Sequence, residues 1–302
     1  MEMKKHSRVC ANIDLDAIRY NMESMHQNID PETKIMAVVK ADGYGHGAIP
    51  IAREIEDLDY LYGYAVATVE EGLMLRRSGI KKPILILGYI FPDQYEDVIE
   101  ADIDPSVFTL EMAKTLSDAA GRVGKTCKIH FAVDTGMSRI GYQVTEESAD
   151  EMAQIAKLPH MIVEGIFTHF AKADETDKTF TTEQTEKFRK MVRMMEERNI
   201  SIPLKHCSNS AGIVDIPEVN MDMVRAGITL YGLWPSDEVD HEAMELHPVM
   251  ELKTHVAYVK ELEAGRAISY GGTFVTERTS RIATIPVGYA DGYCRGLSNK
   301  GS

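Results

Sequence analysis

Short apolar runs alternate with amphipathic stretches along the first 235 residues, and this alternation constrains the fold more than any other feature. Each run has the length of a buried strand and is separated from the next by a helix or a short helical turn. The runs cover 35–39, 60–67, 83–88, 103–108, 127–133, 162–168, 204–208 and 223–230. Because parallel strands need crossovers and a closed barrel has no sheet edge, the pattern predicts a (β/α)₈ TIM-type barrel. An open doubly wound sheet is the alternative.

Helical spacing fills the segments between the runs. The clearest amphipathic stretches cover 48–58, 69–78, 110–120, 146–156 and 182–198. Before the first run, residues 11–15 alternate like a short strand. Asp16 is then placed to cap a helix that carries Ile18, Met22 and Met25 on one face. The sequence therefore predicts an α/β barrel domain over residues 1–235.

The pattern of apolar and polar residues changes after residue 235. An acidic connector, 236–245, leads into residues 250–259, which alternate like a half-buried antiparallel strand. Residues 281–285 show the same alternating pattern, but no closing strand or cap follows. We therefore expect an incomplete all-β domain over 236–302, with which residues 8–14 can pair.

Charge and cysteine usage limit the expected partners. With 33 basic and 47 acidic residues the formal net charge is −14, which disfavours nucleic acid and anionic membrane as partners. Cys10, Cys127, Cys207 and Cys294 are far apart and form no C-x-x-C pair, which disfavours zinc and disulfides. The N-terminal segment is polar, and no apolar run is long enough to cross a bilayer. We expect a cytoplasmic protein that acts on small molecules and binds no metal.

Residues 35–47 lead a lysine out of the first strand and into a glycine-rich turn. Lys40 stands at the carboxyl end of that strand, where parallel α/β domains place their chemistry. A lysine partly removed from water loses some preference for its charged form, and a neutral amine can attack a carbonyl carbon. Lys40 is therefore a candidate for a Schiff base with a substrate or with pyridoxal phosphate. A lysine that merely extends into solvent is the plain alternative.

Two loops after the last strands of the predicted barrel suit an anion. They contain Asn209-Ser210-Ala211-Gly212 and Arg225-Ala226-Gly227-Ile228. Loops at these places in barrel enzymes often hold phosphate through backbone N–H groups and a helix N-terminus. Ordinary turns explain either loop alone, but together with Lys40 the two loops favour a cofactor phosphate.

The stretch 35–47 closely resembles the cofactor-lysine motif of the alanine racemase family, whose members are fold-type III pyridoxal-phosphate enzymes. The two loops resemble the phosphate-binding motifs of the same family. The resemblance implies pyridoxal 5'-phosphate bound at Lys40, with an arginine, Arg225, that donates to the pyridine nitrogen but cannot protonate it, which favours racemisation over transamination. The further cofactor contacts that it implies are Tyr44, His169, Asn209, Ser210, Gly227 and Ile228.

Racemisation calls for two acid/base groups on opposite faces of the substrate. The resemblance implies Lys40 on one face and Tyr270, in the stretch 268–273, on the other. In the family this tyrosine comes from the partner subunit, so the resemblance also implies a homodimer. Arg139 and Tyr289 are the substrate-binding residues that it implies.

Two departures from the family pattern affect the expected site. Ala132 stands where many members have a lysine, so the group that steadies Arg139 is left open. The β-domain of the family also continues past the motif that contains Tyr289. We therefore expect either a fragment of a longer protein or an incomplete site.

The function implied by the resemblance is racemisation of alanine by a two-base mechanism, which supplies D-alanine for peptidoglycan. A serine or dual alanine/serine racemase, linked to D-Ser-terminated wall precursors, would share the motifs, because one hydroxyl discriminates weakly. From another class, a non-catalytic pyridoxal-phosphate carrier predicts no β-domain, and residues 250–292 argue against it. A fold-type III decarboxylase fits the motifs less well.

Overall fold

Residues 8–300 are described by the computed structural model and divide into two units. One unit is Asp14–Val249, and the other combines the chain up to Ile13 with the chain from Met250 onward. The polar N-terminal segment 1–7 and the last two residues of the expected β-rich domain lie outside the described range.

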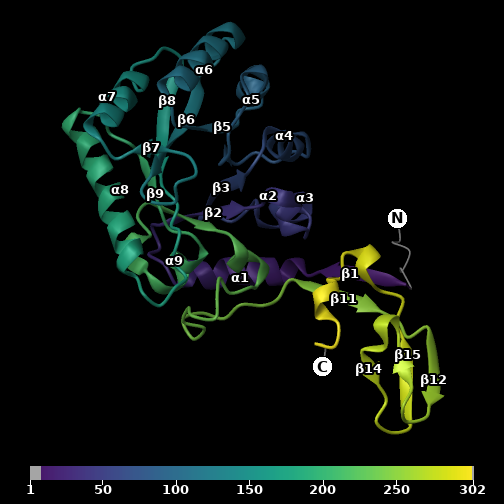
Figure 1. Ribbon diagram of the computed structural model, residues 1–302. Helices are drawn as coiled ribbons and strands as arrows, with labels where there is room; N and C mark the ends of the chain where they lie inside the picture. Colours follow the sequence, from purple (N-terminus) through teal and green to yellow (C-terminus); the bar gives the residue numbers. More distant parts are fainter. Residues whose placement is uncertain (1–7, 301–302) are drawn as a thin grey trace. The chain divides into compact units, whose positions relative to one another are not determined.

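Parallel strands form the barrel of the larger unit, and their colours run from purple through teal to green in Figure 1. They are β2 (Lys34–Val38), β3 (Leu61–Val66), β4 (Ile84–Ile86), β5 (Asp104–Val107), β6 (Cys127–Asp134), β8 (Met161–Phe167), β9 (Leu204–His206) and β10 (Met223–Ala226). Hydrogen-bonded neighbours follow the order β10-β2-β3-β4-β5-β6-β8-β9. A two-residue strand, β7 (Tyr142–Gln143), pairs with β6.

Two backbone hydrogen bonds bridge the remaining gap between β9 and β10. The N–H of Asp222 donates to the carbonyl of Lys205 at 3.2 Å, and the N–H of Arg225 donates to the carbonyl of Ser208 at 3.1 Å. The predicted barrel is confirmed, and the open sheet is wrong. The last predicted run was too long, because β10 ends at Ala226 and the chain turns into a 3₁₀ helix, η3 (Ile228–Tyr231).

Helices connect the strands and flank the barrel in Figure 1. They are α1 (Leu15–Gln27), α3 (Ala48–Ile55), α4 (Val69–Arg77), α5 (Tyr95–Glu100), α6 (Leu110–Val123), α7 (Glu146–Ile155) and α8 (Thr179–Glu197). Helix α5, which is six residues long, lies where a helix or a short helical turn was expected between two runs, although no bounds were predicted for it. Helix α8 begins three residues before the predicted start, with Lys178 at its N-cap.

Helix α1 shows why the predicted cap was wrong. The Asp14 carboxylate, not that of Asp16, accepts the N–H of Ala17 at 3.0 Å, and Asp16 lies inside the first turn. The predicted buried face is confirmed, since it carries the fully buried side chains of Ile18, Met22 and Met25.

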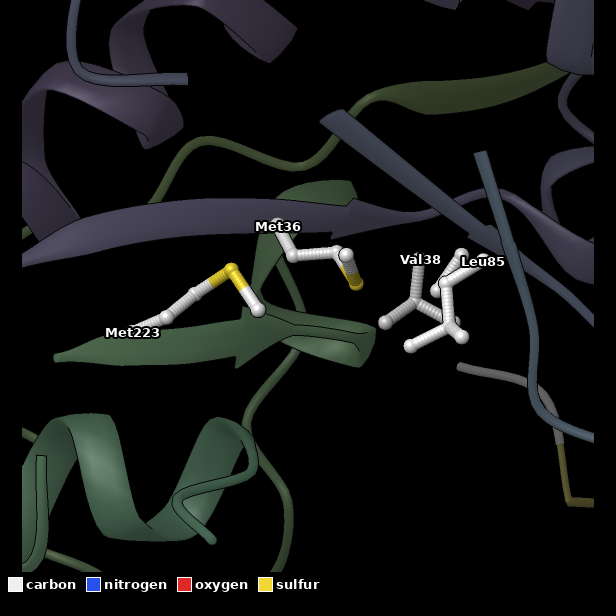
Figure 2. Close-up of a cluster of buried hydrophobic side chains, with 5 residues drawn as sticks. Met36, Val38, Leu85 and Met223 are labelled. Atoms are coloured by element: carbon white, nitrogen blue, oxygen red, sulfur yellow. The ribbon is translucent and has the colours of Figure 1, made fainter. Parts of the chain in front are cut away.

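A buried apolar cluster fills the barrel interior beneath the carboxyl ends of the first strands. It consists of Met36 and Val38 of β2, Ala65 of β3, Leu85 of β4 and Met223 of β10. Figure 2 shows the side chains of Met36 and Met223 between their strands, both extending toward the side where Val38 and Leu85 lie. The alternation along β2 sends these residues inward, so the interior is packed rather than open.

The segment 236–249, which contains the acidic connector 236–245, belongs to the barrel unit. Its side chains at Val239, Met244 and Val249 are buried. The side chain of Asn21 on α1 holds it by accepting the N–H of His247 at 2.7 Å and donating to the carbonyl of the same residue at 2.9 Å. The acidic composition of the connector gave no indication that this segment contacts α1.

The smaller unit consists of antiparallel strand pairs. They are β1 (Val9–Ile13) with β11 (Met250–Thr254), β12 (Tyr258–Leu262) with β15 (Ser280–Thr284), and β13 (Ala267–Ile268) with β14 (Phe274–Val275). Its described residues also form the 3₁₀ turns η4 (Tyr270–Gly272), η5 (Tyr289–Asp291) and η6 (Arg295–Leu297). The single strand predicted over 250–259 is split, because residues 250–254 pair with β1 whereas the chain from Tyr258 pairs with β15.

All four cysteines are free. Within residues 8–300, no helix combines the length and the apolar composition that crossing a bilayer requires.

Candidate active site

A cavity of about 570 Å³ lies at the carboxyl ends of the barrel strands. That volume is in the range of sites for small molecules and cofactors. The cavity contains every site residue that the sequence predicts within the barrel: Lys40, Tyr44, Arg139, His169, Asn209, Ser210, Arg225, Gly227 and Ile228. Tyr270 and Tyr289 lie instead in η4 and η5 of the smaller unit, where the Tyr270 side chain is 90% exposed.

The barrel core forms the floor of the cavity. Val38 belongs to the interior cluster and also lines the cavity, and Leu87 packs against the cluster and lines the cavity too. The depth of the site is therefore set by how the interior is packed.

Lys40 opens a short helical turn, α2 (Lys40–Tyr44), which is left-handed after its first residue. The φ angles are 52° at Ala41, 52° at Asp42, 61° at Gly43 and 53° at Tyr44. Left-handed helical backbone costs about 1–2 kcal/mol for each residue that carries a Cβ. Only Gly43 escapes that cost, so the surrounding contacts must hold the turn in place.

Contacts on both sides of the turn supply that support. The Asp42 carboxylate accepts the N–H of Ala48, the first residue of α3, at 2.9 Å. The hydroxyl of Tyr231 donates to the carbonyl of Val38 at 2.9 Å, and its ring packs against that of Tyr44 with centroids 5.1 Å apart. The segment that carries Lys40 is thus fixed to both η3 and α3.

Burial lowers the pKa of Lys40, and the charge of Arg139 lowers it further, while the carboxylate of Glu71 opposes the shift. A larger fraction of neutral amine is therefore present near neutral pH than for a solvated lysine. Burial also raises the pKa of Tyr44, so its hydroxyl remains a hydrogen-bond donor at neutral pH.

The hydroxyls of Ser210 and Tyr44 and the N–H of Gly227 lie close together at the cavity wall. The hydroxyl of Ser210 accepts the N–H of Gly227 at 3.0 Å. A Cβ placed on Gly227 would lie 3.2 Å from the Ser210 hydroxyl and 3.8 Å from that of Tyr44. Glycine therefore leaves a polar concavity of small volume, which we call the anion cradle.

Asn209 lines the cavity, but its side chain has a local partner. Its oxygen accepts the N–H of Gly212 at 3.1 Å and caps α9 (Ser210–Asp215), a short helix for which the sequence predicted no bounds. The side chain thereby fixes where Ser210 enters the cradle.

The guanidinium of Arg225 is fully buried and holds several barrel strands together. Its Nη1 donates to Nδ1 and to the carbonyl of His206, both at 2.9 Å. Its Nη2 donates to the carbonyls of Thr168 at 2.7 Å and Cys207 at 3.0 Å, and lies 3.4 Å from Nδ1 of His169. Burial lowers the pKa of Arg225 to about 10, so it remains charged at neutral pH.

Sequence reasoning missed the histidines behind Arg225. Nε2 of His206 lies 3.0 Å from Nδ1 of His130, and both rings are completely buried. Burial, with the nearby charge of Arg225, lowers the pKa of His130 to about 3 and that of His169 also to about 3. These histidines are neutral at physiological pH, and no local pattern around either buried ring would have indicated the pair.

Arg139 forms no hydrogen bond or ion pair with any of residues 8–300, and Ala132 lines the cavity without offering a charge. The Arg139 guanidinium is therefore free to bind a carboxylate. Within the same residues, no group of three or more His, Cys, Asp or Glu side chains is arranged to bind a metal ion.

Comparisons with known proteins agree over both units. Residues 13–235 match the family model of the alanine racemase N-terminal domain, and residues 249–302 match that of the alanine racemase C-terminal domain. An alanine racemase of Desulforamulus reducens is 45% identical over 293 residues, which are 97% of this chain and 79% of that protein.

Solved structures give the same result. An alanine racemase of Clostridium difficile superposes with a TM-score of 0.92 at 41% identity, covering 97% of this chain and 76% of the other. A histidine racemase of Leuconostoc mesenteroides superposes with a TM-score of 0.85 at 28% identity, covering 96% of this chain and 77% of the other.

Proposed function

Because the chain belongs to the alanine racemase family, we propose that it is an isomerase that interconverts L- and D-alanine with pyridoxal 5'-phosphate as its cofactor. The observation that carries the proposal is a single cavity shared by the amine of Lys40, the anion cradle and the guanidinium of Arg225. Each of these groups has a distinct use in holding such a cofactor.

The groups around the cavity suit pyridoxal phosphate. Gly227 leaves space beside the hydroxyls of Ser210 and Tyr44, where a phosphate oxygen can accept hydrogen bonds. Arg225 can only donate, which suits an unprotonated ring nitrogen. The amine of Lys40 suits the aldehyde. When bound, the cofactor supplies an electron sink that acidifies the α-proton of an amino acid.

Lys40 and Tyr270 are the acid/base pair of the proposal. The lowered pKa of Lys40 provides a neutral amine that can accept the α-proton on one face. Tyr270 is 90% exposed in the smaller unit, so its hydroxyl is accessible to a second copy of the chain. We therefore propose a homodimer in which Tyr270 acts across the interface, Arg139 binds the substrate carboxylate and Tyr289 lines the substrate entrance.

The proposed product, D-alanine, would serve peptidoglycan synthesis, and we place the reaction in the cytoplasm. The excess of acidic residues, 47 against 33 basic, supports a small-molecule substrate over nucleic acid.

A serine or dual alanine/serine racemase is the second candidate. One of the matched structures is named a histidine racemase, so the fold alone does not choose the amino acid. Serine exceeds alanine by one hydroxyl, and an apolar pocket rejects such an isostere only weakly.

The test is racemisation of L-alanine, L-serine and L-histidine in deuterated water, followed by chiral chromatography and mass spectrometry. We expect L-alanine to give D-alanine with deuterium at the α-carbon. Lys40→Ala should abolish this, and Tyr270→Phe should slow it by a factor of about 10²–10⁴, the usual contribution of a general acid or base. Tyr258→Phe, at another exposed tyrosine of the smaller unit, is the matched control.

Racemisation that survives both active-site substitutions would refute the acid/base pair. Faster turnover of L-serine would favour the second candidate. Borohydride reduction of the cofactor-loaded protein should leave the pyridoxyl group on Lys40, and labelling without turnover of any amino acid would favour a carrier.

A further inference from the structure

Glu71 joins two loops at the edge of the cavity through one carboxylate. It lies in the first turn of α4, and its Oε1 accepts the N–H of Ala41 at 2.6 Å. Its Oε2 accepts the N–H of Ala67 at 2.7 Å. Ala41 follows Lys40 directly, and Ala67 lines the cavity at the end of β3. The carboxylate thus ties the ends of two adjacent barrel strands together.

Each side-chain oxygen of Glu71 accepts a backbone N–H, and a carboxylate is the group that offers two such acceptors. A glutamine at this place would present one acceptor and one donor, and its NH₂ would face a backbone N–H. An aspartate would be shorter by one methylene. Glu71 is only partly exposed, and its bond to Ala67 is part-buried, whereas its bond to Ala41 lies at an exposed position.

The N–H that Glu71 holds belongs to the strained part of the chain. Ala41 is the first of the left-handed residues after Lys40, with φ of 52° and ψ of 47°. A residue with a Cβ keeps such angles only where its surroundings fix them. The bond from Glu71 therefore fixes the backbone at the point where the direction of the Lys40 side chain is set.

We propose that Glu71 is a positioning residue for Lys40, holding the left-handed turn so that the Lys40 amine faces the cavity. The proposal rests on the function proposed above for that amine. Its carboxylate also lies close enough to Lys40 to raise the pKa of the amine against the effect of burial. One side chain thereby holds the backbone next to Lys40 and, against the larger effect of burial, also favours the charged form of its amine.

A purely structural role is the competing explanation. Glu71 also completes the capping box of α4, in which its N–H donates to the hydroxyl of Thr68 and its carboxylate accepts the N–H of Thr68. Thr68→Ala removes half of this box while leaving the bond to Ala41, so it separates the two roles. Glu70→Gln is the charge control, since Glu70 is exposed in the same turn and contacts Gln94 instead.

Two measurements on the folded chain test the proposal without any turnover. Site-resolved amide hydrogen exchange follows the N–H groups of Ala41 and Ala67. Modification of Lys40 by trinitrobenzenesulfonate in the cofactor-free protein, where its amine is not joined to an aldehyde, is followed by peptide mass spectrometry across a pH series and reports the protonation of that amine. Both are made on the wild type and on Glu71→Gln, Glu70→Gln and Thr68→Ala, with thermal unfolding recorded for each.

We expect Glu71→Gln to speed exchange at Ala41 about tenfold or more, as the loss of a hydrogen bond to a charged acceptor implies. It should also move the Lys40 modification profile to lower pH, because a nearby negative charge is removed. Thr68→Ala should lower the unfolding temperature but change neither measurement, and Glu70→Gln should change nothing. Glu71→Asp keeps the charge but shortens the reach, and should affect exchange more than the Lys40 profile.

Equal effects of Thr68→Ala and Glu71→Gln on Ala41 exchange would overturn the proposal and leave a helix cap alone. So would an unchanged Lys40 profile in Glu71→Gln. If Glu71→Gln does not fold, Glu71→Asp decides the matter through exchange at Ala41. Failure of pyridoxal phosphate to label wild-type Lys40 would instead refute the proposed function, whatever the exchange measurement gives.

Discussion

Nη1 of Arg225 lies 2.9 Å from Nδ1 of His206, and this contact fixes the tautomers of two buried rings. A guanidinium can only donate, so Nδ1 of His206 must carry a lone pair and its proton must be on Nε2. That N–H then donates to Nδ1 of His130 at 3.0 Å. The proton of His130 is left on its Nε2, which is buried and has no hydrogen-bond partner within residues 8–300.

The first prediction concerns the protonation of this pair. Nitrogen-15 NMR of histidine-labelled protein should show His206 and His130 as neutral Nε2–H tautomers from pH 8 to pH 5, because burial lowers the pKa of both. The depressed pKa values contribute stability that is present above the unfolded value of about 6.5 and is lost as the pH falls toward about 3. A protonated His206 signal at pH 6 in the folded protein would contradict the arrangement.

The second prediction is that Asp104→Asn stabilises the barrel above pH 7. Asp104 is buried at the start of β5, and burial, with the nearby carboxylate of Glu164, raises its pKa to about 7. A raised pKa favours the folded state only while the group is protonated, so stability is lost between about pH 4 and pH 7 as the carboxyl ionises. The amide cannot ionise, and the free energy of unfolding at pH 8 should rise by at least about 1 kcal/mol.

Urea unfolding at pH 5 and pH 8 measures this effect. Asp118→Asn, at an exposed position on α6, is the control and should change stability little at either pH. The interpretation of Asp104 fails if its variant is equally or less stable than the wild type at pH 8.

The third prediction tests the anion cradle by filling the space beside Gly227. Gly227→Ala places a methyl group 3.2 Å from the Ser210 hydroxyl and 3.8 Å from that of Tyr44, in the space that we assign to the phosphate. Overpacking of this kind costs about 1–3 kcal/mol, which is roughly tenfold to hundredfold in affinity. Titration of the cofactor-free protein with pyridoxal phosphate, followed by absorbance, measures the loss.

Gly121→Ala is the control for this substitution, because a Cβ there meets only His160 at an ordinary distance of 3.4 Å. Its affinity for pyridoxal phosphate should equal that of the wild type. Tight binding by Gly227→Ala would place the phosphate elsewhere.

The fourth prediction is that Ser210→Ala weakens the same affinity by a different route. The hydroxyl of Ser210 accepts the N–H of Gly227 and contacts the hydroxyl of Thr229 at 3.0 Å, so its removal takes this acceptor from the Gly227 N–H and leaves the Thr229 hydroxyl with the sulfur of Met25 at 3.1 Å. Such a loss costs about 1–3 kcal/mol, shared between protein stability and cofactor binding. Calorimetric unfolding with and without pyridoxal phosphate separates the two shares, and Ser148→Ala on α7 is the control. A variant that binds normally would remove Ser210 from the cradle.

The strands of the barrel could be predicted from the sequence because burial on both faces leaves a continuous apolar run that needs no knowledge of partners. The cavity residues could be predicted in part for a similar reason, since Lys40 sits directly after such a run, whereas Gly227 lies within the run predicted over 223–230 and follows β10 only in the structure. Where a contact is local but has several possible acceptors, prediction was poorer, since the carboxylate of Asp14 caps α1 in place of that of Asp16.

Long-range contacts left no trace in the sequence. His130 and His206 are 76 positions apart and meet only because the barrel brings their strands together. The left-handed backbone at Ala41 and Asp42 has no compositional signal, because neither residue is a glycine. Glu71 was not singled out from the sequence, because its bond to Ala41 depends on where the neighbouring loop lies.

Val38 and Leu87 are shared by the packed interior and the floor of the cavity, which has a consequence for engineering. Replacing a methionine or leucine of the barrel interior by a smaller residue would deepen the cavity without changing any group that we assign to substrate or cofactor. Laboratory selection for bulkier amino acids should therefore enrich substitutions underneath the site, at Met36 or Leu85, and not solely around its mouth.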